Sequence, residues 1–317
     1  MKEFTFAAIT YNHSDCIIEH LESLKKLVQK YGREYLNNLI ISDDASKDNT
    51  VELAKKWIEQ NRSLFNEVKV LCPEKNQGIV KNYVTALKCI KTEKFKILAG
   101  DDLYLCENIY DIFDMGDIIF TPLVNFSGSE VVSRHAEYIS REMVYYRNRN
   151  LQETIRDKMK FSMYIQSPGT MWKLSLADEG LYETLSHYTW MEDVPLFSYL
   201  INKQGLKVCF CETPVVAYRS DVGISTNKNH ERAKEIEEES KRIRKEIYVH
   251  RKIKHDILNP YAYKMAFQRL YVKYIGTKTT EGKAFDQKYA QSKIKSGQTI
   301  IEVQQKALQW KKEYAAE

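Results

Sequence analysis

The chain has 317 residues, of which 43% are hydrophobic and 29% charged, and its formal net charge is +5. This composition excludes a generally disordered chain and suits one large domain, or one domain with an appendage, around a buried core. Six scattered cysteines without a Cys-x-x-Cys pair favour reduced thiols over a zinc site. There is no signal-peptide pattern, and no apolar run approaches the roughly 20 residues that span a bilayer. We therefore expect a cytoplasmic protein, with the inner face of the membrane as its only membrane contact.

Short apolar runs alternate with longer segments of helical spacing through the first 120 residues. The runs predict strands at 4–9, 39–41, 68–71, 95–98 and 117–120. Between them, apolar residues repeat at helical spacing, and one helix has Asn49 as its expected N-cap with Glu52 three positions on. Strands that alternate with helices predict βαβ units and a mainly parallel sheet covered on both faces. The expected fold class is α/β.

The rest of the chain is less regular. We expect a loop at 125–129, a charged helical stretch at 141–160 and a turn into a strand at 166–172. From about His230 the chain is charge-dense with helical spacing, and Pro260 breaks it into two helices. A polar linker at 277–282 precedes a last helical segment. This change in charge density and apolar spacing predicts a helical C-terminal extension at 229–317.

Polar side chains follow four consecutive predicted strands, at the edge where parallel sheets bind ligands. They are Thr10, Tyr11, Asn12 and His13, then Asp43 and Asp44, then Lys75, Asn76, Gln77 and Gly78, and then Gly100, Asp101 and Asp102. Their convergence predicts a binding site.

The carboxylates are the most informative of these groups. Asp101 and Asp102 offer oxygen ligands for a hard cation such as Mn²⁺ or Mg²⁺, although the pair alone could equally form a plain turn. With Asp43 and Asp44 at a neighbouring strand end, four carboxylates would repel one another unless a cation or a donor-bearing ligand neutralises them. That repulsion favours a site over a turn.

The remaining strand-end residues each have two interpretations. Asp43 and Asp44 either form a turn or accept from a nucleobase or ribose. Tyr11 either stacks on a base or simply packs. Gly78 permits close backbone approach, and Lys81 with Asn76 beside it could meet a diphosphate, although the chain has no P-loop and no Gly-x-Gly-x-x-Gly motif.

Glu192 and Asp193 form a second acidic pair beside Trp190 and just before Pro195. A carboxylate near Trp in a closing cleft can have its pKa raised by desolvation, as a general base requires. The alternative is a helix N-terminus, whose dipole favours acidic residues and whose first turn accepts Pro. Both interpretations can hold together.

The order of these motifs resembles that of the GT-A glycosyltransferases of family 2. The resemblance covers residues 3 to about 227 and rests on Ile9-Thr10-Tyr11-Asn12, Asp43-Asp44-Ala45-Ser46-Lys47-Asp48-Asn49-Thr50, Asn76-Gln77-Gly78 with Lys81-Asn82, Leu98-Ala99-Gly100-Asp101-Asp102, Glu192-Asp193, and Tyr218-Arg219 with Gly223-Ile224-Ser225. It implies a GT-A α/β/α sandwich at 1–228, with a nucleotide-binding half at 1–120 and an acceptor-binding half at 121–228.

The resemblance also implies roles for individual residues. Donor-binding positions for a nucleotide sugar, usually a UDP-sugar, would be Thr10, Tyr11, Asn12, Asp43, Asp44, Asn76, Gly78, Lys81 and Asp101. Asp102 would be the direct ligand of Mn²⁺ or Mg²⁺. Asp193 would be the catalytic base and Glu192 its companion. Two departures from the family are Ala99, where many relatives are acidic, and Asp221, where relatives often have His, so Asp221 is a second candidate metal ligand.

The expected reaction is an inverting sugar transfer from a nucleotide diphosphate to a hydroxyl of a glycan, lipid-linked or protein-linked acceptor, as in bacterial polysaccharide or glycoprotein biosynthesis. Asp193 would remove the proton from the acceptor hydroxyl. A nucleotidyltransferase is the enzymatic alternative, but residues 10–15 lack the Gly and Lys of a phosphate loop. The non-enzymatic alternative is a catalytically degenerate binding module. The presence of both Asp102 and Asp193 argues against it.

Basic and aromatic residues are interleaved over 241–275. This pattern favours a helical cap on the catalytic domain, with a peripheral membrane or protein contact as the next interpretation. Glutamates nearly balance the basic residues over 231–246, so we expect no nucleic-acid partner.

Overall fold

The computed structural model describes residues 2–132, 142–145, 150–159, 167–221, 232–247, 267 and 270–316. Its first part alternates strands and helices as the sequence predicts: β1 Lys2–Thr10, α1 Ile17–Tyr31, β2 Tyr35–Asp43, α2 Thr50–Gln60, β3 Val68–Leu71, α3 Ile79–Cys89 and β4 Phe95–Ala99. These four strands form one sheet in the order β3-β2-β1-β4, and every neighbouring pair is parallel. The expected α/β class is therefore confirmed.

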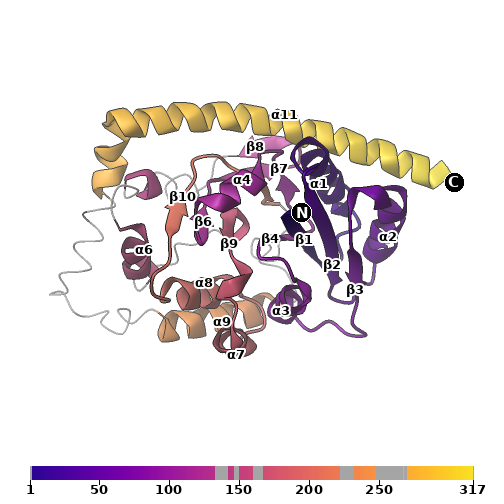
Figure 1. The fold of residues 1–317 in the computed structure, drawn as a ribbon, viewed down its shortest axis with the longest axis horizontal. Helices are drawn as coiled ribbons and strands as arrows, with labels where there is room; N and C mark the ends of the chain where they lie inside the picture. Colours follow the sequence, from indigo (N-terminus) through magenta and orange to yellow (C-terminus); the bar gives the residue numbers. More distant parts are fainter. Residues whose placement is uncertain are drawn as a thin grey trace.

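Helices cover both faces of this sheet (Figure 1). Successive side chains of a strand point to opposite faces, so Phe4 and Phe6 of β1 pack in the core with α1 and α2, whereas Ala7 faces the core formed with α3. Trp57 of α2 is fully buried, and its indole N–H donates to Glu22 of α1 at 2.7 Å. The two helices on that face are thus held together as well as to the sheet.

The start of α2 differs in detail from the prediction. Asn49 lies at the N-cap position, but its side chain makes no capping hydrogen bond. Asp48 accepts from the backbone N–H of Thr50 at 3.0 Å and from that of Ser14 at 3.0 Å. The capping role expected for Asn49 is therefore wrong, because the neighbouring carboxylate satisfies the free N–H of the helix and ties it to the loop after β1.

Seven further strands follow among the described residues: β5 Leu103–Tyr104, β6 Ile118–Phe120, β7 Leu123–Ser127, β8 Glu130–Val132, β9 Thr170–Trp172, β10 Val208–Phe210 and β11 Val216–Arg219. They form one sheet in the order β10-β6-β9 and another in the order β5-β11-β7-β8. The strand expected at 117–120 is confirmed as β6, but it lies outside the four-stranded parallel sheet. The turn and strand expected at 166–172 are confirmed for the described residues 167–172.

Helices of this second part are α4 Ile109–Ile112, α6 Leu151–Met159, α7 Glu179–Ser186, α8 Asp193–Ile201, α9 Ala233–Glu246 and α11 Thr280–Ala316. The described residues of the charged stretch at 141–160 include α6, which agrees with its expected helical form. Pro260 and the rest of 248–266 lie outside the described residues.

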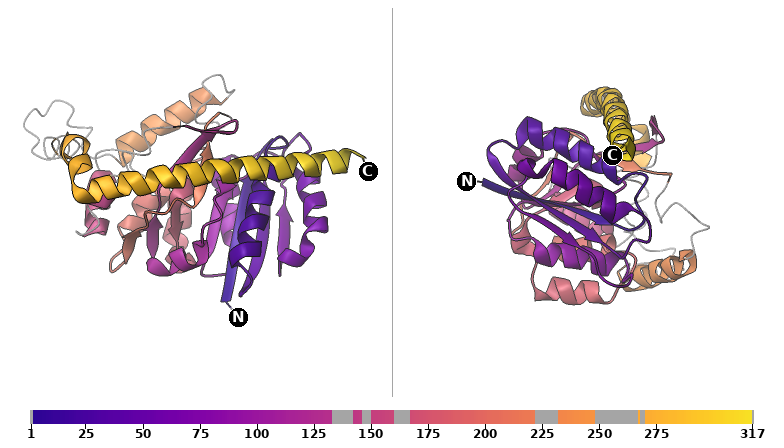
Figure 2. Two further views of the ribbon diagram at one scale, coloured as in Figure 1. Left: turned by 90° about the horizontal axis from the view of Figure 1, so that it is seen from above. Right: turned by 90° about the vertical axis from the view of Figure 1, so that its right-hand side faces the viewer.

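α11 is the longest element described, with 37 residues and a length of roughly 55 Å at the usual helical rise. It crosses the molecule from end to end above α1 (Figures 1 and 2). Its inner side chains Ile300, Val303, Ala307 and Trp310 are buried. In the part of the chain that the structure describes, no helix has the length and apolarity needed to cross a bilayer.

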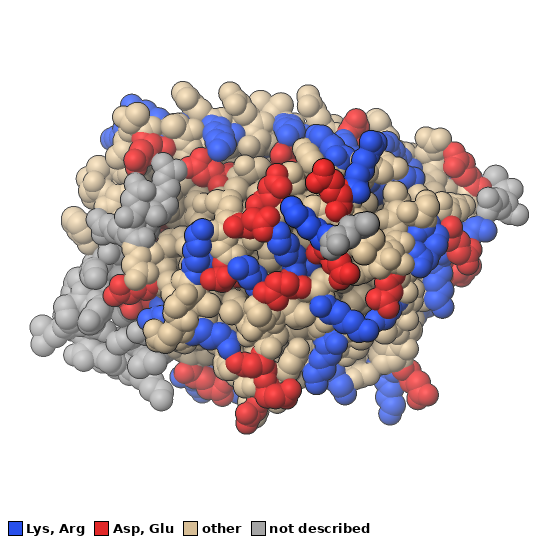
Figure 3. Space-filling view, in the orientation of Figure 1, with Lys and Arg blue, Asp and Glu red and all other residues tan. Residues whose placement is uncertain are grey.

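Basic and acidic side chains are interspersed over the face shown in Figure 3. The mild net charge of the chain is therefore not gathered into one patch on that face. The expectation of no nucleic-acid partner stays a prediction.

Two adjacent isoleucines of α11 test whether this helix is docked on the catalytic core. Ile300 is fully buried and Ile301 is 45% exposed. We expect Ile300→Ala to lower the free energy of unfolding by about 2–5 kcal/mol, because it removes buried methyl groups and leaves a cavity. Ile301→Ala is the matched control, and its cost should stay below about 1 kcal/mol. Urea denaturation of both variants measures this difference, and equal costs would mean that α11 is not packed as the structure shows.

Candidate active site

The carboxyl ends of β1, β2 and β4 meet at one edge of the parallel sheet. Thr10 lies in register with Asp43, and Ile9 lies in register with Ala99. Beyond the last residues of the ladder, the N–H of Asp44 donates to the Thr10 carbonyl at 2.9 Å and the N–H of Gly100 donates to the Ile9 carbonyl at 2.9 Å. The convergence predicted from the sequence is confirmed for these three strand ends.

Asp43 braces the two loops that leave β1 and β2. Its fully buried carboxylate accepts from the hydroxyl of Thr10 at 2.8 Å and from the backbone N–H of Ser46 at 2.7 Å. Asn12 completes the brace, since its N–H donates to the Ser46 hydroxyl and its side-chain oxygen accepts from the N–H of Lys47. Asp43 therefore fixes the shape of this edge, and its predicted contact with a base or ribose stays a prediction.

Two residues of these loops have left-handed backbone conformations. Asn12 has φ of 54° and Ala45 has φ of 60°. Non-glycine residues with such φ values are uncommon, and the strain of order 1–3 kcal/mol persists only where neighbouring contacts enforce it. Here the bonds between the two loops supply that enforcement, and strained backbone of this kind clusters at functional sites.

Asp44 links the end of β2 to the loop before α3. Its carboxylate oxygens accept from the backbone N–H groups of Gln77 at 2.7 Å and Gly78 at 2.9 Å, while Asn76 donates to its carbonyl at 3.3 Å. Burial raises the pKa of this carboxyl, and the two N–H bonds oppose that rise. The predicted residues Asn76 and Gly78 are therefore brought to the same place as Asp44.

Gly78 is needed for a close approach, but the partner is protein. Its φ is +91°, and a Cβ there would lie 2.6 Å from the Cγ2 atom of Thr189. The N–H of Val80 also donates to the Thr189 carbonyl at 3.0 Å. The close approach at this glycine is therefore made by the segment that leads to Glu192 and Asp193, and the predicted contact with a diphosphate stays a prediction. Lys81, predicted beside it, is exposed.

Asp102 lies inside the protein at the end of β4. It is 1% exposed, one carboxylate oxygen accepts from the N–H of Arg219 at 2.9 Å, and the other has no hydrogen-bond partner among the described residues. Burial, followed by the charge of Asp101, raises its pKa well above the usual range. The neighbouring Asp101 is 8% exposed, and its carboxylate accepts no hydrogen bond from the described residues.

Arg219 organises this acidic pair and was not predicted as a site residue. Its side-chain Nε donates to the Asp101 carbonyl at 2.8 Å, and its guanidinium pairs with Glu19 of α1. Gln304 of α11 donates to the same carboxylate of Glu19 at 3.4 Å and to the Gly128 carbonyl at 2.9 Å. The C-terminal helix α11 therefore contacts Glu19, the residue that pairs with Arg219 beside the Asp101-Asp102 pair. Arg219 did occur in the Tyr218-Arg219 motif, but nothing local indicates its partners.

Asp221 follows β11, where its carboxylate accepts from the hydroxyl of Ser127 at 3.0 Å and from the N–H of Gly128 at 2.7 Å. Partial burial acts to raise its pKa, but these bonds outweigh burial and lower it. Among the residues with described positions, no three His, Cys, Asp or Glu side chains form a metal-binding group. Asp221 as a second metal ligand beside Asp102 stays a prediction. Gly223, Ile224 and Ser225 lie outside the described residues.

Glu192 and Asp193 stand at the start of α8, which confirms the helix N-terminus expected there. Asp193 accepts from the N–H of Val194 at 2.7 Å. Burial, and then the charge of Asp193, raises the pKa of Glu192 to about 8, and burial also raises the pKa of Asp193. The desolvation predicted for this pair is therefore present, and it suits a group that must exchange a proton near neutral pH.

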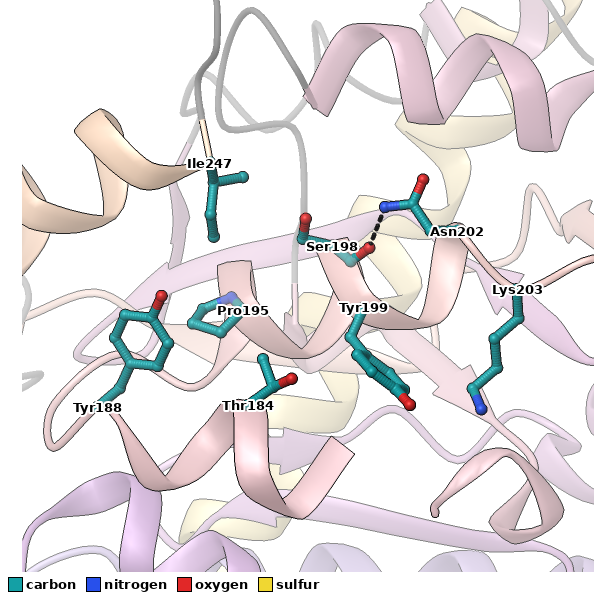
Figure 4. Close-up of a pocket in the computed structure, with 8 residues that line it drawn as sticks. All are labelled: Thr184, Tyr188, Pro195, Ser198, Tyr199, Asn202, Lys203 and Ile247. Carbon is teal, nitrogen blue, oxygen red and sulfur yellow. Dashed lines mark hydrogen bonds between the residues drawn. The ribbon is translucent and has the colours of Figure 1, made fainter. Parts of the chain in front are cut away.

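A hollow of about 390 Å³ opens elsewhere, on the surface of α7 and α8 (Figure 4). Its lining residues are Thr184, Tyr188, Pro195, Ser198, Tyr199, Asn202, Lys203 and Ile247. None of the predicted site residues lines it, so the chemistry is assigned to the strand edge, where the carboxylates converge.

Comparisons with known proteins agree with the fold and with the family resemblance. Residues 5–167 match the model of the family described as glycosyl transferase family 2. No curated protein matches the chain. The crystal structure of S. aureus TarS aligns at 19% identity and a TM-score of 0.50, covering 69% of this chain and 37% of that one. The structure of TarS 1-349 aligns at 17% identity and a TM-score of 0.50, covering 93% and 81%. At such identities the likeness concerns the fold, which is of the GT-A type.

The contact between Gly78 and Thr189 can be tested by adding one methyl group. We expect Gly78→Ala to destabilise the protein by more than Gly205→Ala, because both have positive φ but only Gly78 faces a neighbour. In both variants the alanine must adopt a positive φ, which costs on the order of 1 kcal/mol. Only Gly78→Ala adds a steric clash with Thr189. Thermal unfolding of the two variants gives the comparison. Equal shifts in Tm would show that the loop before α3 does not press on Thr189.

Proposed function

Because the chain belongs to glycosyl transferase family 2, we propose that it transfers a sugar from a nucleotide diphosphate donor, a UDP-sugar, to a hydroxyl of a glycan, lipid-linked or protein-linked acceptor, with inversion at the anomeric carbon. One observation carries this proposal: Asp44 holds the loop at 76–78 against the segment that ends in Glu192 and Asp193. The sheet edge that is predicted to bind the donor is thereby in contact with the segment that carries the Glu192-Asp193 pair. The family match favours sugar transfer over nucleotidyl transfer, and the intact Asp102 and Asp193 argue against a degenerate binding module.

The donor nucleotide is proposed to lie along the loops that follow β1, β2 and β3. Tyr11 is partly exposed and Asn12 is exposed, so both are available to a ligand. Thr10, Asp43 and Asp44 are buried and engaged with one another or with backbone N–H groups, which assigns them to shaping this surface. A surface already held in place loses little conformational entropy when a ligand binds.

A divalent cation, Mn²⁺ or Mg²⁺, is proposed beside Asp101 and Asp102. The residues fit such an ion, since the buried second oxygen of Asp102 and both oxygens of Asp101 have no protein donor among the described residues. Mg²⁺ is commonly held by one or two carboxylates together with substrate phosphates, so a larger protein cage is not required. In place of the direct contact expected for Asp102, we propose direct contact by the more accessible Asp101, with Asp102 oriented behind it by Arg219. When bound, the ion would neutralise charge on a departing diphosphate.

Asp193 is proposed as the general base that removes the proton of the acceptor hydroxyl, with Glu192 as its companion. Burial raises the pKa of both carboxyls, and the charge of Asp193 adds to the rise at Glu192. A carboxylate with a raised pKa takes up a proton more effectively than an ordinary exposed Asp. The helix N-terminus at α8 fixes the position of the pair.

Asp193→Asn tests the base. We expect turnover of a UDP-sugar, followed as release of UDP, to fall by roughly 10²–10⁴ without loss of fold, because the amide cannot accept the proton. Asp178→Asn is the matched control, since Asp178 caps the neighbouring helix α7. Near-normal turnover of Asp193→Asn with any nucleotide sugar used by the native protein would contradict the assignment.

The cation assignment has its own test. We expect Asp101→Asn to raise the Mn²⁺ concentration needed for half-maximal UDP release by about tenfold or more, because one oxygen ligand loses its charge. Asp221→Asn should leave the Mn²⁺ requirement unchanged, since its carboxylate is engaged with Ser127 and Gly128. A raised requirement in Asp221→Asn alone would move the ion to that residue, and activity unaffected by chelation would remove the cation from the proposal.

A further inference from the structure

Three consecutive backbone N–H groups converge on one carboxylate of α9. Glu239 accepts from the N–H of Thr189, Trp190 and Met191, each at 2.8 Å. Its side chain is almost fully buried, at 8% exposed. Successive N–H groups of this kind form an anion-binding nest, and bonds to a charged acceptor are about twice as strong as neutral ones. The nest ends one residue before Glu192.

Other residues in α9, and Arg232 just before it, contact the same segment. Arg242 donates to the His187 carbonyl and lies over the ring of Tyr188, and the hydroxyl of Tyr188 donates to Glu246 at 2.9 Å. Arg232 lies 5.5 Å from the centre of the Trp190 ring. These contacts are at the exposed surface, whereas the side chain of Glu239 is buried. The buried carboxylate therefore provides most of the restraint on the backbone that leads into the acid pair.

We propose that Glu239 is a positioning residue for the Glu192-Asp193 pair: it holds residues 189–191 so that the pair lies against the donor loop at Gly78. This rests on the proposed function of Asp193. The segment is fixed from the opposite side by Gly78 and Val80. Without the carboxylate, three N–H groups would lose their acceptor together, and the segment would be held from one side only. A misplacement of about 1 Å can cost 10²-fold in rate.

Glu239 also acts on the pair through its charge. The charged and titratable groups that face Glu192 are Asp193 beside it, Glu239 from α9 and Tyr83 from α3. Arg242 lies 3.7 Å from the Glu239 carboxylate and offsets part of its charge. The negative charge of Glu239 contributes to the raised pKa of Glu192. Removing that charge should lower this pKa, so the pH at which the pair becomes deprotonated should fall.

Glu239→Gln is the principal variant, because it keeps the size of the side chain and removes its charge. We expect kcat for UDP release to fall by about 10-fold to 100-fold, and the acidic limb of the pH profile to move to lower pH by roughly half a unit. Glu239→Asp keeps the charge and shortens the reach, so kcat should fall while the limb stays in place. Glu246→Gln is the matched control on the same helix, and both measurements should resemble those of the native protein.

Two readouts do not depend on activity and separate this proposal from the proposed function. Hydrogen exchange at the amides of Thr189, Trp190 and Met191 should be faster in Glu239→Gln than in Glu246→Gln, and the carboxyl signal of Glu192 should titrate at lower pH. If the native protein released no UDP from any nucleotide sugar, the proposed function would fail while these measurements still decided the placement. The role of Glu239 is overturned if Glu239→Gln leaves both the amide hydrogen exchange of residues 189–191 and the titration of Glu192 as they are in the native protein. It is also overturned if Glu239→Asp and Glu239→Gln both retain the kcat of the native protein.

Discussion

The carboxylate of Asp44 is the point on which the arrangement of the site depends. It accepts two backbone N–H groups from the loop before α3 while its own N–H donates to the end of β1. Because the group is buried, these bonds act in a medium of low dielectric, where a satisfied polar network is strong and a broken one is costly. The loop that it holds presents Gly78 to Thr189, so the parallel sheet and the segment that carries Glu192 and Asp193 share one support.

The edge above Asp44 is organised before any ligand arrives. Thr10, Asn12, Asp43 and Ser46 bond to one another across the loops after β1 and β2, and they hold Asn12 and Ala45 in left-handed conformations. Fixed groups of this kind need little reorganisation when charge develops beside them, which is a large part of how enzymes stabilise transition states. Asp101 and the second oxygen of Asp102 are the exceptions, since no described residue donates to them. A polar site with its acceptors unsatisfied is suited to a cation or a donor-bearing ligand.

The C-terminal helices support this site from two directions. α11 reaches the acidic pair at β4 through Gln304, Glu19 and Arg219, and α9 reaches the acidic pair at α8 through Glu239. The extension proposed at 229–317 is therefore packed on the catalytic part through its described helices, as the interpretation of a helical cap anticipated. A peripheral membrane or protein contact through 241–275 stays a prediction, and so does the division of the chain at 228.

The sequence by itself determined the parallel strands of the first sheet and the acidic residues at their ends, but not β7, whose last residues fall where a loop was expected. Alternating apolar runs and helical spacing indicated the four parallel strands, and the residues after them indicated Asp43, Asp44, Asp101 and Asp102, because both signals are local. Tertiary structure alone decided the partners of these groups. Arg219 meets Asp102 across 117 residues and Glu239 meets Trp190 across 49, and a bond from a side chain to distant backbone leaves no periodic pattern. Glu239 lies between Ile236 and Ile243 on the inner side of α9, a position where a helix usually has an apolar residue. Only the tertiary structure gives the reason for a carboxylate there, because it shows backbone N–H groups of the distant segment 189–191 converging on it.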